Sequence, residues 1–161
     1  VGASKFYRRQ CFEEIGGFVR EVMWDAIDCH KARFLGWIAR SSDEEAIRFI
    51  HLRPMGSSQK GILTGRMRHG YGQYYMGSSI VYFMATAFYR MIRPPYIAGG
   101  LAMAWGYLKS MLMRKPRQND KALINFIKSY QRRALVVGKK QAIKEINDAQ
   151  NHVWQRDHEN A

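Results

Sequence analysis

Two apolar segments rich in aromatic residues dominate the middle of the chain, Ser78–Ile92 and Tyr96–Met113. Arg93-Pro94-Pro95 separates them, and Gly99-Gly100 and Lys109 interrupt the second. Both are long enough to be helices but fall somewhat short of the about 20 apolar residues that cross a bilayer. We therefore expect two helices that lie in the plane of a membrane or enter it shallowly. A transmembrane hairpin and a purely soluble core stay open as alternatives.

Helical spacing of apolar residues also marks the regions on either side. Lys60–Met76 fits a helix although it contains four glycines, which weaken helices. After Pro116, apolar residues recur with the period of a helix at Ala122, Leu123, Phe126, Ile127 and Tyr130. Gly138 is expected to end that helix, and Lys139–Trp154 to form the last one.

The first 54 residues show short elements of mixed type. The spacing predicts helices over Gln10–Ile15 and Asp25–Leu35, each followed by glycine. Short β-rich runs predict strands over Ser4–Tyr7, Trp37–Arg40 and Ile47–Leu52. This is an α/β pattern, but so few strands cannot make a self-sufficient sheet. The expected fold is an incomplete α/β domain followed by helices, so that the chain itself is mostly α.

Charge narrows the choice of partner. The 161-residue chain has 26 Lys and Arg against 13 Asp and Glu, for a net charge of +13, and no acidic residue occurs from Ala46 to Asn119. Such a balance suits either nucleic acid or an anionic membrane surface. The apolar character of the acid-free stretch favours the membrane, because a groove for phosphate backbones would be wetter. We expect an anionic membrane surface as partner and no nucleic acid. A mean hydropathy of −0.40 excludes a chain that is mostly embedded in lipid.

Two cysteines, Cys11 and Cys29, are too few for a disulfide-stapled domain and stand in no zinc or redox spacing. A reducing, cytoplasmic compartment is therefore expected. The chain begins with Val1 and shows no signal peptide, which indicates that it starts inside a longer protein.

Candidate chemistry begins with two carboxylates, Asp25 and Asp28, in the first turn of an expected helix. Carboxylates there ordinarily satisfy the helix N-terminus, and the alternative is a general base that faces a cleft. Arg53 and Arg66 belong to a set of basic residues that could cradle a phosphate.

Histidines are the second kind of candidate. His51 ends a β-rich run, and strand alternation places it on one face with Ile47 and Phe49, as for a core histidine. The alternative role is a metal ligand, which would need partners that the nearby sequence does not offer. His30 and His69 are weaker candidates and are expected on helix surfaces.

Four elements, taken in order, resemble the second half of a family 2 glycosyltransferase of the GT-A fold. They are Gly2-Ala3-Ser4-Lys5-Phe6-Tyr7-Arg8-Arg9, Ile15-Gly16-Gly17-Phe18, Trp24-Asp25 with Gly36-Trp37, and His51-Leu52-Arg53-Pro54. The resemblance covers roughly residues 1–75 and is specific as an ordered set. It implies that the nucleotide-binding half with its DxD motif is missing, so that this chain alone is an inactive fragment.

By position, the resemblance makes Gly2 part of a glycine loop under the sugar nucleotide, Asp25 the catalytic base and His51 a ligand of a divalent ion, Mg²⁺ or Mn²⁺. Most of the coordination of that ion would come from the missing DxD. Trp24 stands at the substrate site where the family usually has Glu, and this departure leaves Asp28 open as the base. The Gln-x-x-Arg-Trp motif is absent, which argues against a processive cellulose- or chitin-type synthase.

The resemblance implies inverting transfer of a sugar from a nucleotide-sugar donor to the hydroxyl of a lipid-linked or cell-envelope glycan acceptor. Arg53 and Arg66 are then expected to contact substrate. Residues 1–58 would form the acceptor side, 59–115 a linker helix and two membrane-interface helices, and 116–161 basic amphipathic helices. The expected location is the cytoplasmic face of the bacterial inner membrane. The alternatives are a non-catalytic membrane-associated scaffold and, less favoured by the apolar segments, a nucleic-acid-binding module.

Overall fold

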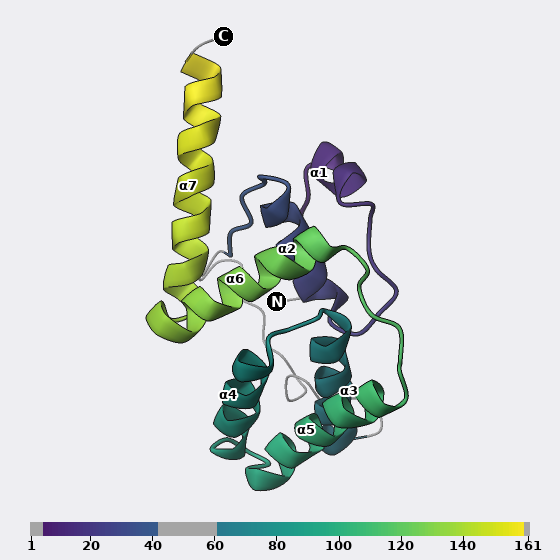
Figure 1. Ribbon diagram of the computed structural model, residues 1–161. Coiled ribbons are helices and arrows are strands. Elements are labelled where there is room, and N and C mark those ends of the chain that lie inside the picture. Colours follow the sequence, from purple (N-terminus) through teal and green to yellow (C-terminus); the bar gives the residue numbers. More distant parts are fainter. Residues whose placement is uncertain (1–4, 42–60, 160–161) are drawn as a thin grey trace. The chain divides into compact units, whose positions relative to one another are not determined.

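The computed structural model describes residues 5–41 and 61–159, with side chains up to residue 152. These ranges contain seven helices and no β-strand (Figure 1). The helices are α1 (Arg9–Glu14), α2 (Trp24–Phe34), α3 (Ile62–Tyr75), α4 (Ile80–Met91), α5 (Ile97–Leu112), α6 (Lys121–Val137) and α7 (Lys139–Glu159). The prediction that the chain is mostly α is therefore confirmed for the described residues.

The chain divides into two compact units. The first unit comprises residues 1–20, 24–49 and 132–161, and the second comprises 21–23 and 50–131. The first therefore holds α1, α2 and α7, and the second holds α3, α4 and α5, while α6 contributes to both.

The first unit is built around α1 and α2. Its core consists of Cys11, Ile15 and Ala32, with Phe12 and Trp37 packed against it. The predicted end of α2 at glycine is confirmed, because Gly36 has a φ of 92° and the N–H of Trp37 bonds the carbonyl of Ala32 at 2.9 Å. This left-handed turn satisfies carbonyls that the last helical turn leaves without partners.

Two predicted strands of the first unit are wrong. Residues 5–7 and Trp37–Arg40 form no strand. The carbonyl of Ala39 instead accepts hydrogen bonds from side chains, at 2.9 Å from Arg33 Nη2 and 3.3 Å from Asn147 Nδ2. A short β-prone run becomes a strand only where a neighbouring strand provides ladder hydrogen bonds, and no described segment does so. The third predicted strand, Ile47–Leu52, lies outside the described residues.

The second unit is a set of packed helices in which α5 contacts both α3 and α4 (Figure 1). Glycines set the close approach of α3 and α5. A Cβ atom on Gly70 would lie 2.0 Å from the carbonyl oxygen of Met103, and one on Gly106 would lie 2.1 Å from that of Met67. The glycines that weaken α3 as an isolated helix therefore serve its packing, and the predicted helix is confirmed.

The interior of this unit combines apolar and polar contacts. Phe83 stacks on Tyr107 with ring centroids 4.2 Å apart, beside the buried Met103. The side chain of Gln131 donates to Ser78 Oγ at 2.9 Å and accepts from the backbone N–H of Ser79 at 2.9 Å. These bonds join the start of α4 to α6 and satisfy polar groups that burial would otherwise leave without partners.

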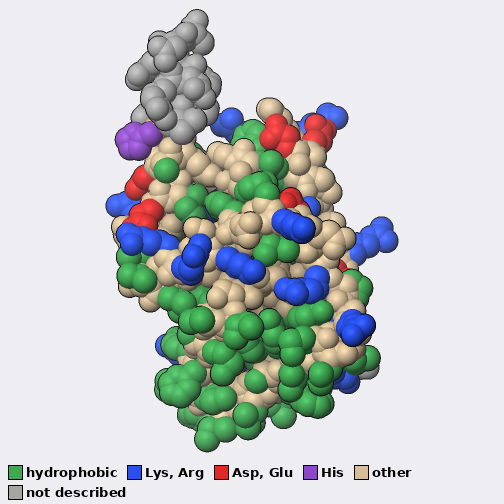
Figure 2. All heavy atoms as spheres, viewed as in Figure 1, with side chains coloured by type: hydrophobic (Ala, Val, Ile, Leu, Met, Phe, Trp, Pro, Cys, Tyr) green, Lys and Arg blue, Asp and Glu red, His purple; other side chains and the backbone are tan. Residues whose placement is uncertain are grey.

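One face of α4 and α5 consists of exposed apolar side chains, and we call it the apolar face. It comprises Ile80, Val81, Met84, Phe88, Tyr89, Leu101, Trp105, Leu108, Met111 and Leu112. Figure 2 shows hydrophobic side chains gathered over the region where Figure 1 places these two helices. A water-soluble monomer rarely exposes so large a contiguous patch unless it binds something there. None of the helices among the described residues combines the length and the apolar content that crossing a membrane requires.

Candidate functional site

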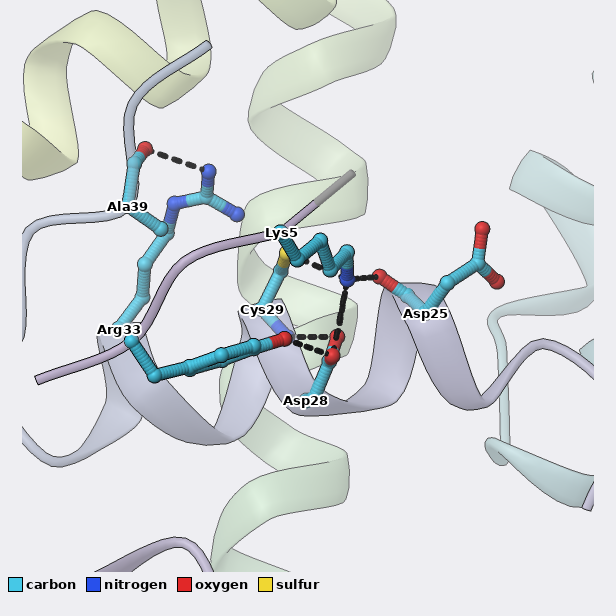
Figure 3. Close-up of polar contacts among 7 residues, drawn as sticks. Lys5, Asp25, Asp28, Cys29, Arg33 and Ala39 are labelled. Carbon is cyan, nitrogen blue, oxygen red and sulfur yellow. Dashed lines mark hydrogen bonds and ion pairs between the residues drawn. The ribbon is translucent and has the colours of Figure 1, made fainter. Parts of the chain in front are cut away.

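The two candidate carboxylates of α2 have different surroundings, and Asp28 is the buried one. It is 1% exposed, and Lys5 Nζ lies 2.7 Å and 2.8 Å from its two carboxylate oxygens (Figure 3). The hydroxyl of Tyr7 donates to the same carboxylate, and so does the backbone N–H of Cys29 at 2.6 Å. Asp28 thus ties the segment before α1 to α2, which is a positioning role.

Burial keeps Tyr7 and Cys29, two of the neighbours of Asp28, in their neutral forms. It raises the pKa of Tyr7, and the hydrogen bond that the hydroxyl donates to Asp28 raises this pKa further. Burial also raises the pKa of the Cys29 thiol, although the charge of Lys5 acts in the opposite direction. Tyr7 therefore stays a donor, and Cys29 is not an activated nucleophile.

Asp25 is placed differently in the same helical turn. It is half-buried, and Lys5 donates to its backbone carbonyl rather than to its side chain. Figure 3 shows its carboxylate directed away from the Lys5 ammonium. That carboxylate has no hydrogen-bond partner among the described residues. Of the two candidates, only Asp25 has a carboxylate that accepts no hydrogen bond from the described residues.

Trp24, predicted as a substrate contact, lies in an aromatic cluster. Its ring meets that of Phe18 edge-on, with centroids 4.9 Å apart, and Phe18 in turn meets Phe12 and Tyr7. The Lys5 ammonium lies 5.4 Å from the Trp24 ring, within the range of a cation–π contact. This cluster packs around Trp24, the first residue of α2, which directly precedes Asp25.

Arg66 and the remaining candidates are distributed over the rest of the chain. Arg66 lies on α3 in the second unit and is buried, 4% exposed. Gly2, Arg53 and His51 lie outside the described residues. Within the described ranges no group of three His, Cys, Asp or Glu side chains could hold a metal ion. The divalent ion stays a prediction.

His30 was expected on a helix surface, but it is half-buried in α2. Burial and, to a smaller extent, the nearby charge of Arg33 lower its pKa to about 4, although Asp28 acts in the opposite direction. A histidine with a folded pKa below its unfolded value of about 6.5 takes up its proton first in the unfolded chain.

We therefore expect the first unit to lose stability as pH falls from about 6.5 to about 4, by on the order of 2 kcal/mol from this group. Urea unfolding of the wild type and of a His30→Gln variant at several pH values measures the effect. The variant should show a flatter pH dependence over this range, and an unchanged slope would contradict the role of His30.

Sequence reasoning missed Lys5 and Tyr7, which complete the Asp28 cluster. Both lie in the segment for which a strand was predicted, and in extended backbone residues two apart share a face. The Lys5-x-Tyr7 spacing was the available signal, because an ammonium and a phenol on one side can both donate to a single carboxylate.

Comparison with known proteins adds no family. No family model, curated protein or solved structure matches this chain.

Proposed function

We propose that this chain is the acceptor-side part of an inverting glycosyltransferase that works on the surface of an anionic membrane, with Asp25 as the general base. The observation that carries the proposal is the division of labour between the two carboxylates of α2. Asp28 is enclosed by Lys5, Tyr7 and Cys29, while the carboxylate of Asp25 has no partner among the described residues.

The chemistry asked of Asp25 is the removal of a proton. Its carboxylate would take the proton of the acceptor hydroxyl while that oxygen attacks the anomeric carbon from the face opposite the leaving nucleoside diphosphate. The bond from the anomeric carbon to the diphosphate oxygen breaks as the new glycosidic bond forms, which inverts the configuration. Transfer of a labelled sugar by the wild type and by an Asp25→Asn variant tests this step.

The membrane part of the proposal is supported by the apolar face together with charge. The second unit contains twelve Lys and Arg but only two acidic residues, Glu21 and Asp120. Apolar side chains flanked by cations suit the boundary between acyl chains and anionic headgroups. An enzyme held there would meet an acceptor that is attached to lipid.

The apolar face yields a test with a matched control. We expect Leu101→Glu to weaken binding to vesicles of phosphatidylcholine and phosphatidylglycerol about tenfold or more, because an exposed Leu on α5 becomes a carboxylate. Val136→Glu makes a similar change at an exposed residue of the first unit and should have little effect. Co-sedimentation measures both variants. Equal losses of binding in the two variants would mean that only the added negative charge matters. Unchanged binding of Leu101→Glu would contradict attachment through the apolar face.

The apolar face also favours a second candidate function, a membrane-associated scaffold without catalysis. Both functions require the same binding to vesicles. They differ in transfer, since a full-length scaffold would show no sugar transfer that depends on Asp25.

A further inference from the structure

Arg66 is a buried cation with two guanidinium nitrogens that lack hydrogen-bond partners among the described residues. It is 4% exposed, and its Nε and Nη1 atoms have no hydrogen-bond partner among the described residues. A guanidinium stays charged at any physiological pH, and arginine is almost never fully buried unless it is paired. Its burial therefore points to a partner that is not part of the described chain.

The acidic residues of the second unit do not provide that partner. Its only carboxylates are those of Glu21 and Asp120. Glu21 accepts a hydrogen bond from the hydroxyl of Tyr71 at 2.9 Å, and Asp120 accepts from the backbone N–H groups at the start of α6 at 2.9 Å and 3.0 Å. The sequence from Ala46 to Asn119 contains no other acid.

Among the described residues, a second cation, Arg90 in the last turn of α4, acts on the charge of Arg66. Burial lowers the pKa of the Arg66 guanidinium, and the charge of Arg90 lowers it further. Two partly desolvated cations repel each other. An anion bound between them would attract both and offset this repulsion.

The start of α5 adds to this positive field. The stem of Arg66 lies against the first turn of α5, where a Cβ atom on Gly99 would be 3.9 Å from Arg66 Cγ. The helix begins at Ile97 without a side-chain cap and without an acidic residue in its first turn. Its backbone N–H groups and dipole favour an anion at this end. The paired donors of a guanidinium suit phosphate in particular.

The surroundings indicate that the phosphate is attached to an apolar group. Ile92, Tyr96 and Ile97, between and beside the two helices, are each 60% exposed or more. We propose that Arg66, together with Arg90 and the first turn of α5, binds the phosphate group of a lipid. This inference rests on the membrane-surface part of the proposed function and names the headgroup chemistry that the surface recognises.

Thermal unfolding of the full-length protein with soluble probes tests the site. The probes are short-chain phosphatidic acid, short-chain phosphatidylcholine and inorganic phosphate. We expect phosphatidic acid to raise the Tm of the wild type by about 3 °C or more and the other two to have a much smaller effect. An equal rise with inorganic phosphate would overturn the lipid part, and no rise with any phosphate would overturn the site.

Two methionine variants separate this site from general charge. Arg66→Met and Arg68→Met remove the same charge from the same helix, but Arg68 is exposed. Arg66→Met should weaken binding to phosphatidic acid about tenfold or more, whereas Arg68→Met should retain nearly all of it. Without ligand, Arg66→Met should raise the Tm, because it removes an uncompensated buried cation. Equal losses of binding in both variants would overturn the proposal.

The Arg66→Lys variant tests the phosphate site if Arg66→Met fails to fold. It preserves the charge but removes the paired donors, so we expect binding of phosphatidic acid to weaken while the fold is retained. Wild-type affinity in this variant would contradict recognition by the guanidinium.

The outcomes also distinguish this site from the proposed function. Leu101→Glu should weaken attachment to anionic vesicles whether or not they contain a phosphate monoester. Loss of the Arg66 effect alone therefore contradicts only the phosphate site. Conversely, lipid binding that depends on Arg66, without sugar transfer that depends on Asp25, would support the phosphate site and contradict the proposed enzyme activity.

Discussion

Asp25→Asn in the full-length protein is expected to lower sugar transfer by about 10²–10⁴-fold, because an amide cannot take the proton of the acceptor hydroxyl. The affinity for the sugar nucleotide should change little, since the base acts on the acceptor. A transfer assay with labelled donor gives the rate, and calorimetric titration of the donor gives the affinity. The substitution keeps the size of the side chain, so the two measurements separate chemistry from binding.

The fold should tolerate this change. The Asp25 carboxylate has no side-chain partner among the described residues, and its main structural benefit is its place in the first turn of α2. That interaction with the helix dipole is worth at most about 1 kcal/mol. Near-normal turnover in a folded Asp25→Asn protein would show that Asp25 is not the general base.

Asp28→Asn is expected to lower the free energy of unfolding of the first unit by about 3 kcal/mol. The reason is that the variant leaves the Lys5 ammonium, 15% exposed, without its partner at 2.7 Å. It also replaces a charged acceptor of the Tyr7 hydroxyl by a neutral one. Urea unfolding followed by far-UV circular dichroism measures the loss.

The double variant Lys5→Met with Asp28→Asn provides the control. Removing the unpaired ammonium should restore part of the stability, because the remaining groups are neutral. A single Asp28→Asn variant as stable as the wild type would show that the ion pair contributes nothing. Strong loss of transfer with unchanged stability would instead make Asp28 the base.

These two substitutions are chemically identical and lie three residues apart on one helix. The structure predicts opposite phenotypes for them, with loss of activity at Asp25 and loss of stability at Asp28. The contrast arises from burial and hydrogen bonding, because both side chains carry the same functional group.

Much of the fold could be predicted from local pattern. Helices α4 and α5 follow from two apolar segments separated by Arg93-Pro94-Pro95, and Gly36 and Gly138 mark helix ends with φ values of 92° and 84°. The strand predicted at Trp37–Arg40 was wrong because strand formation depends on a neighbour and not on the run itself. The glycines of α3 argued against a helix when only the local sequence was considered. Gly70 instead permits close packing of α3 against α5, and this contact is not visible in the local sequence.

The candidate site could be predicted only in part. Sequence pattern placed Asp25 and Asp28 near the start of a helix, but it left open which of them is the better candidate for a base. That choice depends on Lys5 and Tyr7, more than 20 residues away along the chain, whose donors enclose Asp28 alone. The burial of Arg66 was likewise not visible, because its basic neighbours in the sequence include the exposed Arg68.

The sequence by itself determined the helical segments, the acid-free stretch and the net positive charge, because periodicity and composition are properties of neighbouring residues. Only the tertiary structure decided which carboxylate is enclosed, which glycines permit helices to touch, and which buried arginine has nitrogens without a partner among the described residues. These properties arise from contacts between residues distant in sequence. The basic charge that first indicated a membrane surface now includes one specific cation, Arg66, with a proposed lipid phosphate as its partner.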